Sequence, residues 1–143
     1  MSNTKSAQLT WSGDGLNFHG LMGSGYELDF SGQSGPDTGT SPMEMLLASA
    51  AACSAMDIVH VLRKKREDLT GFSININGQR ADSHPQVFTA AHITFTFRGR
   101  NLNPKAVERA IQLSQETYCS VSITLQRAGT DITTSYEIEE ETD

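Results

Sequence analysis

The alternation of apolar and polar residues predicts a short antiparallel meander at the start of the chain. Residues 6–11 and 16–22 have the pattern of short strands, and residues 26–30 alternate apolar and polar side chains, as is typical of half-buried strands. The turn sequence at 12–15, Ser-Gly-Asp-Gly, separates the first two of these segments. A stretch rich in Gly, Ser and Asp at 31–40 is predicted to be a loop.

A long helix is predicted over residues 41–68. Ser41 suits the N-cap, Pro42 suits the first helical position, and Glu44 follows Ser41 by three residues, which together make a capping box. Apolar or small side chains fill nearly every position of the first half, so we expect this helix to be buried on several sides. Polar residues become frequent after Met56, which predicts that the C-terminal half reaches solvent.

The rest of the chain alternates between predicted strands and one further helix. Strands are predicted at 72–79, 86–100 and 131–140, and a helix at 103–119. The segment 121–129 is compatible with a turn containing some helix or with a strand. Helical spacing places a set of mostly apolar residues on one face of the second helix: Val107, Ala110, Ile111, Ser114 and Tyr118.

This order of elements, β-β-β-α-β-β-α-β with mostly antiparallel strands, predicts an α+β fold with helices on one face of a sheet. The length of 143 residues fits one domain over 1–143. The first helix is too apolar to be covered on one side only. We therefore expect it to pack against its copy in a two-fold homodimer.

Composition narrows the classes of partner. The formal net charge is −6, and an acidic surface argues against nucleic acid or an anionic membrane as the main partner. The N-terminus lacks the pattern of a secretory signal, and no apolar run is expected to be long enough to cross a bilayer. These features predict a cytoplasmic protein.

The chain has two cysteines, Cys53 and Cys119, and a structural disulfide is not expected in the cytosol. Cys53 lies too far into its helix to benefit from the helix dipole. Asp57 and His60 share its helix face, and a carboxylate alone raises the pKa of a thiol. Small hydroxyl residues beside Cys119 could donate hydrogen bonds. The residues leave open a reactive pair or two small buried side chains.

The same spacing raises the question of a metal site. Cys53, Asp57 and His60 could together bind a metal ion, but the sequence contains no second cluster of ligands to complete such a site. We therefore predict neither a bound metal nor a cofactor.

Two cysteine motifs in order carry a family resemblance. The sequences SPMEMLL at 41–47, AAACSAMDIV at 50–59 and KAVERAIQLSQETYCSVS at 105–122 resemble the OsmC/Ohr family of osmotically induced and organic-hydroperoxide-resistance proteins, and look closest to its YhfA-like branch. The resemblance implies an intertwined homodimer in which a curved antiparallel sheet wraps two long central helices. It also implies two sites at the subunit interface.

The resemblance further implies a two-cysteine redox mechanism. By motif position, Cys53 would attack the O–O bond of a hydroperoxide and become a sulfenic acid, and Cys119 would condense with it to a disulfide. A dithiol such as a lipoylated protein would then reduce that disulfide. Glu44, which the capping box already explains, completes the set of candidate catalytic residues.

The sequence departs from the family's peroxidases at two positions. The family's peroxidases carry an arginine near the N-terminus that lowers the thiol pKa and binds the peroxide. This sequence has no arginine before Arg63, and Lys5 is the only cation in that stretch. Their glutamate after the helix-starting proline is replaced by Met43, and Glu44 lies about 100° further round the helix. Three hypotheses follow. The first is a thiol-dependent hydroperoxide reductase. The second is an OsmC-like protein without efficient peroxidase activity that binds a small apolar or thiol-reactive ligand in the interface pocket or senses redox state, and the third is a purely structural role for both thiols, with function through partner binding.

Overall fold

The structure, a computed structural model, describes residues 3–142 and divides them into two compact units. The first unit ends at Leu46 and the second begins at Leu47. The expectation of one domain over 1–143 remains a prediction.

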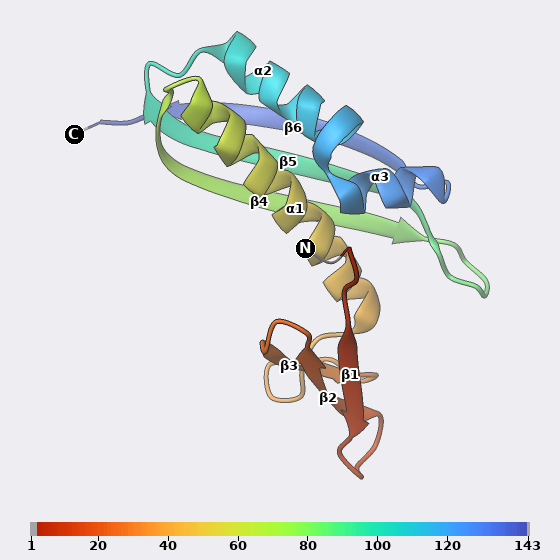
Figure 1. The fold of residues 1–143 in the computed structure, drawn as a ribbon. Helices are drawn as coiled ribbons and strands as arrows, with labels where there is room; N and C mark the ends of the chain where they lie inside the picture. Colours follow the sequence, from red (N-terminus) through yellow and green to blue (C-terminus); the bar gives the residue numbers. More distant parts are fainter. Residues whose placement is uncertain (1–2, 143) are drawn as a thin grey trace. The chain divides into compact units, whose positions relative to one another are not determined.

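The first unit is the predicted antiparallel meander (Figure 1). Its strands are β1 (Ala7–Trp11), β2 (Asn17–Met22) and β3 (Glu27–Ser31), paired in that order. The turn between β1 and β2 is closed by the Trp11 indole N–H, which donates to the Gly15 carbonyl at 3.0 Å. Alternation and turn residues were therefore sufficient to predict this unit.

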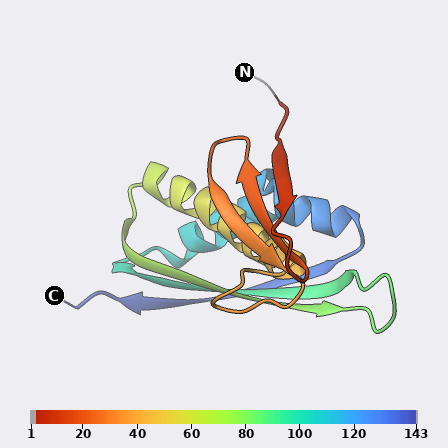
Figure 2. The same ribbon diagram turned by 90° about the horizontal axis from the view of Figure 1, so that it is seen from below.

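The second unit is an α+β arrangement with helices on one face of a sheet, as predicted (Figures 1 and 2). The sheet has the strand order β4–β5–β6. Helix α1 begins in the first unit and continues through the second. The elements of this part of the chain are α1 (Pro42–Lys64), β4 (Asp68–Arg80), β5 (Phe88–Arg100), α2 (Pro104–Leu113), the π-helix η1 (Ser114–Tyr118), α3 (Ser120–Arg127) and β6 (Asp131–Glu140).

The direction of one strand pair differs from the prediction. β4 and β5 are antiparallel, as expected, but β5 and β6 are parallel, with Ile93 opposite Thr134. The chain between these two strands passes through α2, η1 and α3 on the helical face of the sheet. Such a helical crossover returns the chain to the end of the sheet at which it started, so the next strand runs parallel.

The core of the second unit lies between the sheet and the helices. Period-two alternation along β5 directs Ile93, Phe95 and Phe97 inward, and all three are fully buried. Phe97 stacks on Phe72 of β4 with ring centroids 4.6 Å apart. Val107 of α2 belongs to the same cluster. The predicted apolar pattern of this strand therefore sets the position of the helices above it.

Helix α1 buries one stripe rather than several sides. Its buried residues are four apart in sequence: Ala50, Ser54, Ile58 and Leu62. The C-terminal half was predicted to reach solvent, but Ile58 and Leu62 in that half are buried. Helical periodicity places them on the same core-facing side as Ala50 and Ser54. On another face Met56 remains 72% exposed.

The expectation that no run could cross a bilayer is also wrong. By length and composition, α1 would suffice to span a membrane. This observation is weak evidence for a membrane segment, because core helices of soluble proteins pass the same test.

The second predicted helix, 103–119, is shorter than expected. Asn103 caps α2 as predicted, accepting a hydrogen bond from the Lys105 backbone N–H at 3.0 Å. After Leu113 the helix widens into η1, and the ambiguous segment that follows forms α3. The wider π turn changes the angular position of later residues. Tyr118 is consequently 56% exposed and lies off the predicted apolar face.

Candidate functional site

The fold brings together the two thiols, which lie 66 residues apart in the sequence. Cys53 belongs to α1, and Cys119 joins η1 to α3. Both sulfur atoms and a carboxylate oxygen of Asp57 lie within 4.8 Å of one another. Cys53 is partly buried, and Cys119 is fully buried. All three residues belong to the second unit.

The position of Cys119 is set by the π-helix. Its backbone N–H donates to the Ser114 carbonyl at 2.7 Å, which closes the wide turn, and Cys119 then becomes the N-cap of α3. Its sulfur accepts hydrogen bonds from the Ser54 hydroxyl at 3.3 Å and from the Ser122 backbone N–H at 3.4 Å. π turns recur at functional sites because they re-aim side chains, and this one aims a thiol at α1.

The environment of Cys53 favours its protonated form. Burial raises the pKa of this thiol, and a hydrogen bond with Cys119 together with the charges of Cys119 and Asp57 raises it further. The backbone N–H of Val121, near the start of α3, opposes this effect by hydrogen bonding. Within residues 3–142, the groups that act on this pKa include no cationic side chain, which agrees with the missing arginine.

Asp57 lies one helical turn after Cys53 and is also partly buried. Burial raises the pKa of its carboxyl group, while a hydrogen bond from the Ser114 hydroxyl and the charge of His60 oppose that rise. The Ser114 hydroxyl donates to Oδ2 at 3.3 Å. In this cluster the pKa values of the Cys53 thiol and the Asp57 carboxyl group are both raised. The Cys119 side chain is fully buried.

A network of polar side chains surrounds the thiols, and sequence reasoning missed most of it. The Gln115 side-chain amide donates to the Ser54 hydroxyl at 2.8 Å, and that hydroxyl in turn contacts Cys119. Ser54 and Ser114 are both fully buried. One signal was available: Ser114 was predicted on an otherwise apolar helix face, where a polar residue needs a buried partner.

The metal-binding set considered from the sequence is not the set that the fold assembles. Cys119 joins Cys53 and Asp57 in the cluster, whereas the side chain of His60 is exposed. Two thiolates and a carboxylate are donors that Zn²⁺ accepts.

Glu44 makes the predicted capping box. Its carboxylate accepts hydrogen bonds from the Ser41 backbone N–H at 3.1 Å and the Ser41 hydroxyl at 3.0 Å. The Ser41 hydroxyl oxygen accepts in return from the Glu44 backbone N–H at 3.2 Å. Hydrogen bonds from Ser41 hold the pKa of this carboxyl group below its usual value. Glu44 belongs to the first unit, and its catalytic role stays a prediction.

A cavity of about 570 Å³ borders the thiol cluster through Asp57. Its lining combines cationic or basic side chains with apolar ones: His60, Lys64, Lys65, Val61, Leu113 and Tyr118. The cavity gives the Asp57 carboxyl group access to small molecules from solvent.

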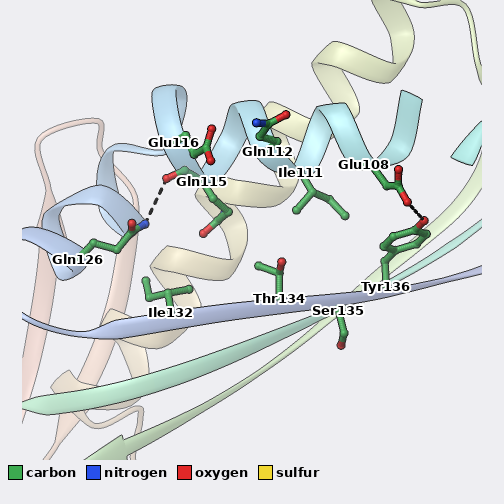
Figure 3. A pocket seen from close by; sticks show the side chains of 10 residues that line it. All are labelled: Glu108, Ile111, Gln112, Gln115, Glu116, Gln126, Ile132, Thr134, Ser135 and Tyr136. Atoms are coloured by element: carbon green, nitrogen blue, oxygen red, sulfur yellow. Dashed lines mark hydrogen bonds between the residues drawn. The ribbon is translucent and has the colours of Figure 1, made fainter. Parts of the chain in front are cut away.

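A second cavity, of about 600 Å³, lies between the α2–η1 segment and β6 (Figure 3). Its lining contains no thiol. Gln115 connects this cavity to the cluster, because its side-chain amide donates to the Ser54 hydroxyl. Its backbone carbonyl accepts from the Gln126 amide at 3.2 Å (Figure 3). Its Oε1 is buried without a hydrogen-bond partner among residues 3–142. Tyr136 closes the other end by donating to Glu108 at 2.7 Å.

Comparisons with known proteins agree with this geometry. The model of the family described as OsmC-like protein matches residues 35–135. Protein YhfA of Escherichia coli (strain K12) is 41% identical over 132 residues, which cover 92% of this chain and 96% of that protein.

Two solved structures extend the comparison. The crystal structure of a hypothetical protein from Aquifex aeolicus VF5 is 30% identical, with a TM-score of 0.87 over 99% of this chain and all of that one. The organic hydroperoxide resistance protein OhrB of Bacillus subtilis shares the fold at 18% identity, with a TM-score of 0.61 over 94% of this chain and 98% of that one. On the family match and the identity to YhfA, the chain belongs to the family of OsmC-like proteins.

Proposed function

We propose that the protein is a cytoplasmic thiol-based redox protein in which Cys53 and Cys119 form a reversible dithiol–disulfide couple. The observation that carries the proposal is the approach of the two sulfur atoms to within 4.8 Å. A disulfide bond needs a sulfur–sulfur distance of about 2.05 Å, so the two sulfurs would have to move closer to bond. Cys53 is the more accessible of the two and would react first.

The proposed oxidant is an organic hydroperoxide, and the proposed activity is its reduction. Cys53 attacks the terminal oxygen of the hydroperoxide, which gives a sulfenic acid and an alcohol. Cys119 then attacks the oxidised sulfur, and water leaves as the disulfide forms. A dithiol reduces the disulfide by exchange and is itself oxidised. The fold shared with an organic hydroperoxide resistance protein supports this choice of oxidant.

A specific observation favours a second candidate function. The pKa of Cys53 is raised rather than lowered, and thiolate is the reactive form. An OsmC-like protein with slow peroxide chemistry could instead sense redox state or bind a small apolar ligand in the cavity beside Asp57. In that case the disulfide would form with a general thiol oxidant but not with a hydroperoxide.

The test is a thiol count after exposure to cumene hydroperoxide. One equivalent is expected to remove both free thiols and lower the protein mass by two hydrogen atoms, and excess dithiothreitol is expected to restore both. The same reaction on urea-unfolded chain is expected to be slower, because unfolding separates the sulfurs. If the folded protein keeps both thiols under excess hydroperoxide but loses them to diamide, the second candidate replaces the first.

The proposal includes a homodimer formed through α1. Ala48, Ala52 and Met56 are exposed and four apart, so they make an apolar stripe on the helix side opposite the buried one. Two such stripes could pack closely because alanine is small. We further propose that residues 1–143 act as one OsmC-like domain and that Glu44 contributes to catalysis.

The Met56→Glu variant is expected to be monomeric. A glutamate at position 56 of the stripe would place two like charges at an apolar interface, which is unfavourable without a partner cation. Gel filtration with light scattering should give twice the chain mass of 15.6 kDa for the wild type and the single mass for the variant. Asn75→Glu, on an exposed position of β4, is the matched control and should remain dimeric. A monomeric wild type would contradict the proposed dimer.

A further inference from the structure

Oxidation of a thiol by a hydroperoxide requires the movement of a proton. The attacking sulfur must lose its proton, and the departing alkoxide, a strong base, must gain one. Cys53 favours its protonated form, and within residues 3–142 no cationic side chain acts on its pKa. The protein therefore needs a group that can both accept a proton and return it.

Asp57 has the position for this task. It follows Cys53 by four residues on α1, and a carboxylate oxygen lies within 4.8 Å of both sulfur atoms. The Ser114 hydroxyl donates to Oδ2, which orients the carboxylate and leaves the other oxygen free of that bond. Asp57 also lines the cavity of about 570 Å³. Its carboxyl group is therefore close to both thiols and also borders space for a small molecule.

The charged and titratable groups around Asp57 come from several elements. On α1 they are Cys53, His60 and Lys64, and Lys65 follows the end of that helix. Tyr118 comes from η1, and Cys119 from the junction before α3. Burial raises the pKa of the Asp57 carboxyl group above its usual value, while a hydrogen bond from Ser114 and the charge of His60 oppose the rise. A base with a pKa closer to the working pH transfers protons more effectively in both directions.

We propose that Asp57 is the proton carrier of Cys53 oxidation: it accepts the thiol proton as the sulfur attacks the hydroperoxide and donates it to the departing alkoxide. The S–O bond forms as the O–O bond breaks, so the sulfur loses two electrons and the peroxide gains them. The products are the Cys53 sulfenic acid and an alcohol, and Asp57 returns to its initial ionised form. This inference rests on the proposed hydroperoxide reductase function.

The proposal predicts opposite effects of one substitution on two reactions of Cys53. In Asp57→Asn the negative charge that raises the thiol pKa is removed, so alkylation by iodoacetamide, whose iodide leaves without a proton, is expected to be faster. Oxidation by cumene hydroperoxide is expected to be about 100-fold slower, since general acid–base catalysis typically contributes 10²–10⁴-fold. A purely electrostatic or structural role of Asp57 would move both rates in the same direction.

The rates are best measured at several pH values in a Cys119→Ser background, with the sulfenic acid trapped by dimedone. Asp57→Glu, which keeps the carboxyl group, is expected to restore part of the oxidation rate, and Asp82→Asn on an exposed loop should change neither reaction. Equal oxidation rates in Asp57→Asn and its parent would overturn the role of Asp57 alone. A parent that is alkylated but not oxidised would overturn the proposed function as well.

Discussion

Replacing Cys53 by serine is expected to reduce hydroperoxide consumption to the background rate of the dithiol reductant alone. A thiolate attacks the O–O bond with its polarisable sulfur electrons, whereas a serine hydroxyl is a poor nucleophile toward that bond. The other thiol cannot substitute, because Cys119 is fully buried beneath α1 and η1. The measurement is the loss of cumene hydroperoxide in the presence of dithiothreitol.

The matched variant is Cys119→Ser, which removes the second thiol but keeps the first. It is expected to undergo the first oxidation and then to accumulate sulfenic and sulfinic acid on Cys53, because no neighbouring thiol can condense with it. Mass spectrometry of the two variants after peroxide treatment should show added oxygen in Cys119→Ser and no change in Cys53→Ser. Equal turnover by the wild type and both variants would contradict the redox proposal.

Local sequence signals were sufficient for most elements. The last strand was predicted over 131–140 and lies at those residues, and the capping box of Ser41 and Glu44 forms as expected. These features depend on alternation and on contacts a few residues apart, which a sequence pattern records directly. The direction of β6 was wrong because the pattern of a strand does not record which neighbour it pairs with or in which direction.

The candidate site was predictable only in part for the same reason. The motif resemblance paired Cys53 with Cys119, and the two sulfurs do approach each other. Their approach depends on the π turn at 114–118. There the Cys119 N–H bonds to the carbonyl five residues earlier, at Ser114, instead of four residues earlier as in an α-helix. Nothing in the period of the apolar residues indicates such a turn. It also explains why Tyr118 was placed on the wrong face and why the hydrogen bond of Ser114 to Asp57 was missed.

The sheet that supports this site should be sensitive to Phe97. Phe97→Ala is expected to lower the free energy of unfolding by about 3–5 kcal/mol, the usual cost of truncating a buried phenylalanine. The side chain is fully buried, stacks on Phe72, and meets the edge of the Tyr136 ring at a centroid distance of 6.4 Å. Urea unfolding of fully reduced protein is the appropriate measurement, because a Cys53–Cys119 disulfide would change the stability of the unfolded chain.

Thr96→Ala provides the control for that measurement, because Thr96 precedes Phe97 on β5 and points to the opposite face of the sheet. Its replacement is expected to cost less than about 1 kcal/mol, the span of β-propensity differences. The ratio of the two costs tests which face of β5 is in the core, independently of any thiol chemistry. If Thr96→Ala proved as destabilising as Phe97→Ala, the assignment of Phe97 to the core face of β5, on which α1 and α2 pack, would be contradicted.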